Sequence, residues 1–407
     1  MPSQHLPVIT PGYLTIAAAL CFCAGGLYGW SALVPVIENT FAGSTAQSGR
    51  VFSIAIVSFT AAVLLIPRLT DAARSLYASG MIGIAGVFCL LLASIAGSYW
   101  QFLVCFSVGF GFVSGALYIN VLTMVATTQR ARWLTPVMVA MFGFGGVVFG
   151  PLWRQMAAHG WEAKSLLPLA VLLLISSVVA MHADKQSNAL CLNSLSPWRF
   201  LQSQAQRRKT NEPQARYDKP FFLIWAIFAT GSTAGLMVLG LASKIIEHSG
   251  GSVNIASAGI AGIALGNTMG RLSVSAQLCF MGVTSVALLA TLAGGTGILI
   301  VLASVTGGST AFGLSLVALG YGVTASVIPV MVQRQFGAAN FSRVYSIIFT
   351  AWGMAGLASP WLAGILFDAS GNFSSALQLA LATTTLSGLL LLWFAALDST
   401  LVKRHFL

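Results

Sequence analysis

The sequence predicts an all-α membrane protein with twelve transmembrane helices in two six-helix halves. Three observations lead to this class: the composition, the recurrence of long apolar segments, and one long polar segment near the middle. Of the 407 residues, 57% are hydrophobic and only 7% are charged, whereas a soluble domain carries about a quarter charged residues. The composition therefore argues against a soluble enzyme and indicates a chain that crosses a bilayer many times.

Apolar segments of the length that spans a bilayer, about 20 residues, recur along the whole chain. We expect helices over residues 13–37, 47–67, 77–96, 100–127, 133–156, 166–183, 220–243, 253–276, 279–294, 297–332, 343–367 and 374–397. The polar segment 184–218 separates a first half, residues 1–183, from a second half, residues 219–407. The first apolar run is too long for the core of a signal peptide, so we expect it to be a retained helix.

The basic residues predict the orientation of the chain. The net charge is +11, but the charges sit in short loops between apolar segments, where they orient a membrane protein and do not form a nucleic-acid surface. With both termini in the cytoplasm, 15 of the 20 Lys and Arg residues fall on the cytoplasmic side. We therefore expect a multi-pass protein with cytoplasmic termini, a lipid environment and no nucleic-acid partner.

Arg271 is the one basic residue that we expect within the membrane, since the others fall at the ends of the expected helices or between them; its segment reads IASAGIAGIALGNTMGRLSVS over residues 255–275. Arginine stays protonated in proteins, and its insertion into a spanning helix costs roughly 2.5–3.5 kcal/mol. Asn267 lies four residues earlier and therefore shares its helix face. Gly262, Gly266 and Gly270 form a small-xxx-small ridge, which predicts close approach of a neighbouring helix.

Two structural explanations compete with a functional one for Arg271. It could reach the cytoplasmic surface, since the segment ends a few residues later, or it could pair with an acidic side chain. The nine acidic residues all fall in loops or at the ends of expected helices: Glu38, Asp71, Glu162, Asp184, Glu212, Asp218, Glu247, Asp368 and Asp398. A substrate anion is then the strongest remaining partner, through charge-assisted hydrogen bonds.

Several segments resemble a known family. They include AGGLYGWSALVPVIENTF at 24–41, TAGLMVLGLAS at 233–243, GYGVTASVIPVMVQRQFG at 320–337 and VYSIIFTAWGMAGLASPWLAGILFDASG at 344–371. These are similar to the oxalate/formate antiporters and related monocarboxylate porters of the major facilitator superfamily. The resemblance implies a monomeric carrier in the cell inner membrane, a substrate site between the halves, and an arginine of the eighth helix on the substrate carboxylate.

The chain also departs from this pattern. The dicarboxylate antiporters carry a second cation, a lysine, where this chain has Trp352. One buried positive charge balances one carboxylate, so we expect a monocarboxylate with Trp352 as an apolar wall. The superfamily's gating loop after the second helix keeps Asp71 and Arg74 in PRLTDAARS, but the equivalent loop AQLCFMG carries no charge.

Aromatic residues on the helices that line the cavity in the resembling family complete the expected site. Tyr28, Trp30, Tyr118 and Tyr321 are the candidates beside Arg271, Asn267 and Trp352, because tyrosines combine apolar area with a hydroxyl that can bond a carboxylate. Asn120 follows Tyr118 by two residues and is a weaker candidate. Packing in the core is an equally simple explanation for each aromatic residue.

The expected function is secondary active transport of a small organic anion, such as lactate, pyruvate or formate, by alternating access. No embedded acidic residue or histidine suggests a proton carrier, so proton symport and anion exchange both stay open. We expect the positive charge to disfavour closure of a site without an anion. The alternatives are transport of a larger carboxylate, such as a siderophore, and a non-transporting anion sensor. We expect no enzyme activity, no cofactor and no metal.

Overall fold

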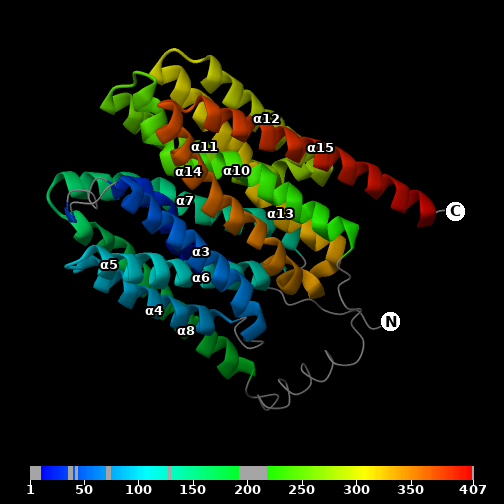
Figure 1. Cartoon of the computed structure of the whole chain (residues 1–407). Coiled ribbons are helices and arrows are strands. Elements are labelled where there is room, and N and C mark those ends of the chain that lie inside the picture. Colours follow the sequence, from blue (N-terminus) through cyan, green and yellow to red (C-terminus); the bar gives the residue numbers. More distant parts are fainter. Residues whose placement is uncertain are drawn as a thin grey trace.

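The computed structural model describes residues 11–34, 40–41, 45–69, 75–126, 128, 130–191 and 218–405. They are almost entirely helical (Figure 1). The first part of the chain forms α1 (Pro11–Ala24), η1 (Gly25–Ala32), α3 (Thr45–Leu69), α4 (Leu76–Ser94), α5 (Tyr99–Phe102), η2 (Leu103–Phe110), α6 (Gly111–Ala126), α7 (Ala131–Ala158), η3 (Glu162–Leu166) and α8 (Leu167–Cys191). The second part forms α10 (Lys219–His248), α11 (Val253–Phe280), α12 (Val283–Ala303), α13 (Gly307–Ile348), α14 (Thr350–Ser370) and α15 (Ser374–His405).

Within the described ranges, eleven helical segments are long and apolar enough to cross a membrane. Some of them join several elements: α1 and η1 form the first span, and α5, η2 and α6 form the span Tyr99–Ala126. The helix α11 has 28 residues and is long enough to span a membrane, but it is not among these eleven segments. Its sequence includes the polar residues Arg271 and Asn267. Together these segments give the all-α, multi-pass membrane architecture that the sequence predicts.

The helices of the first part pack mainly on one another, and so do those of the second (Figure 1). The helix α4 packs on α8 and α3 packs on α6, while α13 packs on α10, α11 and α12. The helix α8 continues to Cys191, beyond the predicted end of the first half at residue 183. The limits of the linker stay a prediction, since residues 192–217 lie outside the described ranges.

The boundary between the ninth and tenth spans was predicted in the wrong place. Helices were expected over residues 279–294 and 297–332, but α12 runs through this point to Ala303, and the break falls at residues 304–306. The helix α13 lies against α12 at Gly297, where a methyl group would meet the Gly313 carbonyl oxygen at 2.6 Å. The new helix begins at Thr306, whose hydroxyl accepts from the Ser309 N–H at 3.3 Å, as an N-cap does.

The tenth and eleventh spans are joined at Gly337. Its backbone has φ 76° and ψ 164° inside α13, a conformation that glycine adopts readily and other residues rarely do. The two spans on either side are Gly307–Ala338 and Asn340–Phe367. The chain thus turns from one span into the next with almost no loop, which fixes the ends of the two helices relative to each other.

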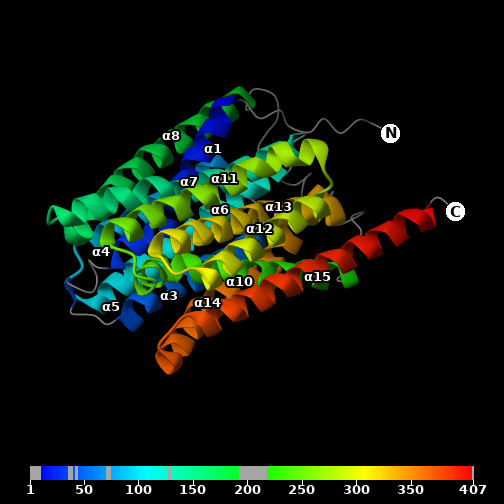
Figure 2. The same ribbon diagram turned by 90° about the horizontal axis from the view of Figure 1, so that it is seen from above.

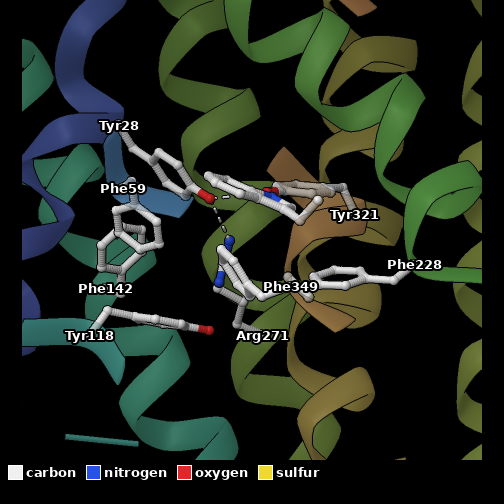
Figure 3. A pocket seen from close by; sticks show the side chains of 10 residues that line it. Tyr28, Phe59, Tyr118, Phe142, Phe228, Arg271, Tyr321 and Phe349 are labelled. Carbon is white, nitrogen blue, oxygen red and sulfur yellow. Dashed lines mark hydrogen bonds between the residues drawn. The ribbon is translucent and has the colours of Figure 1, made fainter. Parts of the chain in front are cut away.

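The glycine ridge of α11 faces α13. Methyl groups at Gly266 and Gly270 would overlap the carbonyl oxygens of Ser315 and Leu319. Backbone therefore lies against backbone along this contact, as the small-xxx-small pattern predicts. The close packing holds α11 firmly. Arg271 points to the interface with the first part of the chain (Figure 3), and Asn267 contacts it from the same helix.

We expect Gly266→Ala to destabilise the protein, because the added methyl meets a helix backbone that cannot move independently. Overpacking of this kind costs about 1–3 kcal/mol, so the melting temperature in detergent should fall. Gly295→Ala in α12 is the matched control, since nothing lies within 4 Å of a methyl group there. Equal melting temperatures for the two variants would contradict the packing of α11 on α13.

The first and second parts of the chain meet along α7 and α11, which lie side by side in Figures 1 and 2, and along α3 and α14. Three hydrogen bonds cross this interface near the end where α6 meets α7, here called the linker-side end. Gln333 Nε2 donates to the Ala126 carbonyl at 3.0 Å, and Ser275 Oγ donates to the Trp133 carbonyl at 3.2 Å. The hydroxyl of Thr123 donates to that of Ser342 at 3.3 Å.

Candidate substrate site

A small cavity lies in the interface between the first and second parts of the chain (Figure 3). Its volume is about 10 Å³, which is at most enough for one water molecule. Ten residues from both parts line it: Tyr28, Phe59, Tyr118, Phe142, Phe228, Arg271, Tyr321, Ala325, Phe349 and Trp352. The site thus combines one cation, four hydrogen-bonding aromatic side chains and a wall of phenylalanine rings.

Arg271 lies at the centre and does not reach the surface of the protein. The residue is only 2% exposed, so surface snorkelling is not its role in this structure. Its Nε donates to Asn267 Oδ1 at 3.1 Å and its Nη1 to the Val139 carbonyl at 3.3 Å. Its Nη2 approaches the Tyr28 hydroxyl at 3.5 Å. These partners are all uncharged, as the distribution of acidic residues in the sequence suggested.

Gly143 of α7 leaves room for the arginine. A methyl group at this position would lie 2.8 Å from Arg271 Cδ and 2.9 Å from Nε. Asn267 is 2% exposed and bonds the guanidinium from the preceding turn of α11. The arginine side chain is therefore held from its own helix by an amide and from the opposite helix by a glycine and a carbonyl group.

Tyr28 belongs to η1, a 3₁₀ segment that continues α1. This segment packs on the glycines of α7, where a methyl group at Gly146 would lie 2.7 Å from Tyr28 Cβ. A 3₁₀ stretch within a spanning helix turns its side chains to a different pitch from the α-helix before it. The close contact with α7 and the local 3₁₀ pitch together direct the phenol to the guanidinium (Figure 3).

Tyr321 and Trp352 extend this contact across the interface. The Tyr28 and Tyr321 hydroxyls are 2.9 Å apart, and Trp352 Nε1 donates to the Tyr321 hydroxyl at 2.7 Å. The Arg271 carbon Cζ also lies 5.5 Å from the Tyr28 ring centroid and 5.7 Å from that of Tyr321, within cation–π range. Trp352 is therefore a hydrogen-bond donor in the site as well as an apolar wall.

Tyr118 lies on the other side of Arg271 from Tyr28 (Figure 3). Its hydroxyl is 3.1 Å from that of Tyr345. The rings of Phe59, Phe142 and Phe349 surround it, with centroids 5.5, 5.2 and 5.7 Å away. The phenol is thus held by aromatic packing. Its hydrogen bond to Tyr345 is a second tyrosine pair, after Tyr28 and Tyr321, that joins the two parts of the chain.

The structure brings together Arg271, Asn267, Tyr28, Tyr118, Tyr321 and Trp352. Two other candidates point elsewhere. Trp30 packs on Phe106 at 5.5 Å within the first part of the chain, and Asn120 donates to Ser79 Oγ on α4 at 2.7 Å. Each is two residues from a tyrosine of the site, a spacing that puts the pair on different helix faces. Asp71 and Arg74 lie outside the described residues.

Sequence reasoning missed the phenylalanine wall, and it also missed Tyr345, which does not line the cavity but pairs with Tyr118. Phe349 precedes Trp352 by three residues, so a helical face through Trp352 would have found it. Tyr345 precedes Phe349 by one further turn and stacks on Phe341 at 5.1 Å. Phe59, Phe142 and Phe228 carry no such signal, because a phenylalanine in a spanning helix is most often simply apolar.

The site is rich in hydrogen-bond donors. A guanidinium has five N–H groups, of which three have partners among the described residues. Trp352 can only donate. Arg271 donates to the Tyr28 hydroxyl and Trp352 donates to the Tyr321 hydroxyl. The hydrogen bond between the two phenols uses one of their two hydroxyl hydrogens. The other hydroxyl hydrogen is available to donate to a ligand. Such a site suits a ligand that is anionic and offers acceptors.

Comparison with known proteins identifies the fold. No family model and no curated protein matches the sequence. Among solved structures, the chain is similar to one described as a major facilitator superfamily transporter, FucP, in the outward conformation. The TM-score is 0.64 at 16% identity, and the match covers 94% of this chain and 98% of that chain. The protein therefore has the major facilitator fold.

Proposed function

We propose that this protein is a secondary active transporter that carries a small organic monoanion across the membrane by alternating access. The observation that carries the proposal is Arg271, a permanent positive charge that is 2% exposed, lies between the two parts of the chain and has only uncharged partners among the residues that the structure describes. An ionisable residue inside a membrane protein marks a substrate or ion path by default. In this fold, substrate sites lie at the interface of the two halves.

The charge balance of the site supports a monocarboxylate such as lactate, pyruvate or formate. Arg271 is the one cation among the ten residues that line the cavity. A dianion would bring a second charge into this buried site without a partner, which is costly. The free N–H groups of Arg271 and the spare phenol hydrogen of Tyr28 or Tyr321 would bind the carboxylate, and the phenylalanine rings would cover the rest of the substrate.

The proposal places the protein in the cell inner membrane as a monomer with both termini in the cytoplasm. The positive-inside distribution of the loop residues supports the orientation. The inner membrane and the monomeric state rest on the resemblance to the oxalate/formate antiporters and the monocarboxylate porters.

A thermal-shift panel on the purified protein tests the substrate class. A ligand that binds only the folded state raises the melting temperature. We expect formate, lactate or pyruvate at about 100 times its dissociation constant to raise it by a few degrees, since the gain is about 2.7 kcal/mol. Oxalate should have less effect, because its second charge has no partner. Counterflow in proteoliposomes with the stabilising compound then tests transport.

Other results of this panel would replace the proposal. Strongest stabilisation by oxalate would require a second cation in the site and contradict the argument from charge balance. A response only to bulky carboxylates would favour a carrier of larger metabolites. Stabilisation by a carboxylate that shows no counterflow would favour an anion sensor.

A further inference from the structure

Two tyrosine pairs hold the site closed across the interface, one on each side of Arg271. Tyr28 of η1 pairs with Tyr321 of α13 at 2.9 Å. Tyr118 of α6 pairs with Tyr345 at 3.1 Å. In each pair one phenol comes from the first part of the chain and the other from the second, and Figure 3 shows Tyr28 and Tyr118 on opposite sides of the guanidinium.

The buried charge is compensated by the protein itself in this arrangement. The three hydrogen bonds from Arg271 end on an amide oxygen, a main-chain carbonyl and a phenol. The rings of Tyr28 and Tyr321 add two cation–π contacts, which are strongest when they are removed from water. A carboxylate is therefore not required to stabilise the arginine when the two parts of the chain are in contact.

The closed arrangement also leaves no space for a carboxylate. The cavity volume of about 10 Å³ is that of one water molecule, whereas a carboxylate group alone has three heavy atoms. A substrate can enter only if the tyrosine pairs separate. The same side chains thus have two sets of partners: each other in the closed arrangement, and the substrate when it is bound.

This geometry argues against the expectation that the charge would disfavour closure of a site without an anion. A carrier is an obligatory exchanger when its empty form cannot pass through a closed state. Here the closed state is stabilised by contacts that a bound anion would have to replace. We infer that the empty carrier closes and reorients on its own, so that the protein catalyses net flux of its substrate and is not an obligatory exchanger. The inference rests on the proposed function.

Efflux from proteoliposomes separates the two modes of transport. Vesicles loaded with a mixture of ¹⁴C-labelled formate, lactate and pyruvate, with equal potassium on both sides and valinomycin to compensate the charge of the moving anion, are diluted into buffer without carboxylate or into buffer with the unlabelled mixture. We expect the two initial rates, each corrected for protein-free vesicles, to agree within about threefold. Efflux only into the unlabelled mixture would overturn the inference and leave the proposed function standing. No protein-dependent efflux in either buffer would overturn the proposed function, and the inference with it.

Tyr345→Phe tests the role of the tyrosine pairs. Tyr345 does not line the cavity, so its hydroxyl is not needed for the substrate, but its loss leaves the Tyr118 hydroxyl without this partner. One buried hydrogen bond corresponds to about a 2- to 10-fold change in rate. Net efflux should slow by this factor while exchange changes little.

The matched control is Tyr77→Phe, which removes the hydroxyl of an exposed tyrosine on α4 and should leave both rates unchanged. Equal slowing of net efflux and exchange by Tyr345→Phe would overturn the assignment of the pair to closure of the empty carrier. Unchanged net efflux in Tyr345→Phe would do the same.

Discussion

Arg271→Gln is expected to abolish the response to monocarboxylates. Glutamine keeps an amide that can reach Asn267 but loses the charge and the remaining N–H donors. Hydrogen bonds to charged groups contribute about 1.5–3 kcal/mol each, so loss of two of them should weaken binding by about 100-fold or more. The thermal shift with formate, lactate or pyruvate should disappear at concentrations that saturate the wild type, and counterflow should fall to the background of empty vesicles.

The melting temperature without carboxylate shows whether the variant folds. Burial of an arginine is costly, so we expect Arg271→Gln to be as stable as the wild type or more stable. Arg334→Gln is the matched control because it removes the same charge from an exposed position of α13. A wild-type ligand response in Arg271→Gln would show that the arginine has a structural role and would remove the main support for an anion site.

Gly143→Ala is expected to impair substrate binding without unfolding the protein. The added methyl would lie 2.8 Å from Arg271 Cδ, so the flexible arginine side chain has to move while the helices stay in place. Displacement of a binding group by about 1 Å can cost up to about 100-fold. We expect affinity to fall by about 10- to 100-fold in the thermal-shift titration, with a change in melting temperature of only a few degrees.

Gly150→Ala on the same helix is the matched control. A methyl group there meets only Gly29 Cα at 3.7 Å, an ordinary van der Waals contact, so binding should be retained. If Gly143→Ala binds a monocarboxylate as tightly as Gly150→Ala does, the position of Arg271 against α7 is not important for recognition. Loss of binding in both variants would indicate a general effect on α7.

The spanning helices could be predicted because each one is a long apolar segment, and the error at the ninth span shows the limit of this signal. Glycine is a helix breaker in an isolated chain, yet Gly294 and Gly297 of α12 stay helical where other helices lie close to them. Hydropathy describes the transfer of a segment to lipid. It does not describe where along an apolar region one helix ends and the next begins.

The centre of the site could be predicted from Arg271 because one charge in an apolar segment is a strong signal. The helix rotation was harder to predict. Tyr28 and Trp30 are both aromatic and two residues apart, but only Tyr28 contacts the guanidinium, while Trp30 packs on Phe106. Both residues lie in η1 and point to different faces, and the packing of η1 on α7 puts the Tyr28 face beside Arg271. Phe59, Phe142 and Phe228 could not be singled out, because the chain has 25 phenylalanines and most are simply apolar residues of spanning helices.

The hydrogen bonds at the linker-side end determine how the contact between the two parts of the chain responds to salt. Gln333, Thr123 and Ser275 join the two parts of the chain through uncharged groups. Dissolved ions screen the attraction between exposed charges over a length of about 10 Å at 0.1 M salt, but they have little effect on hydrogen bonds between neutral partners. Ionic strength should therefore leave the strength of these three hydrogen bonds nearly unchanged. Their contribution to the contact between the two parts of the chain should be the same at low and at high salt.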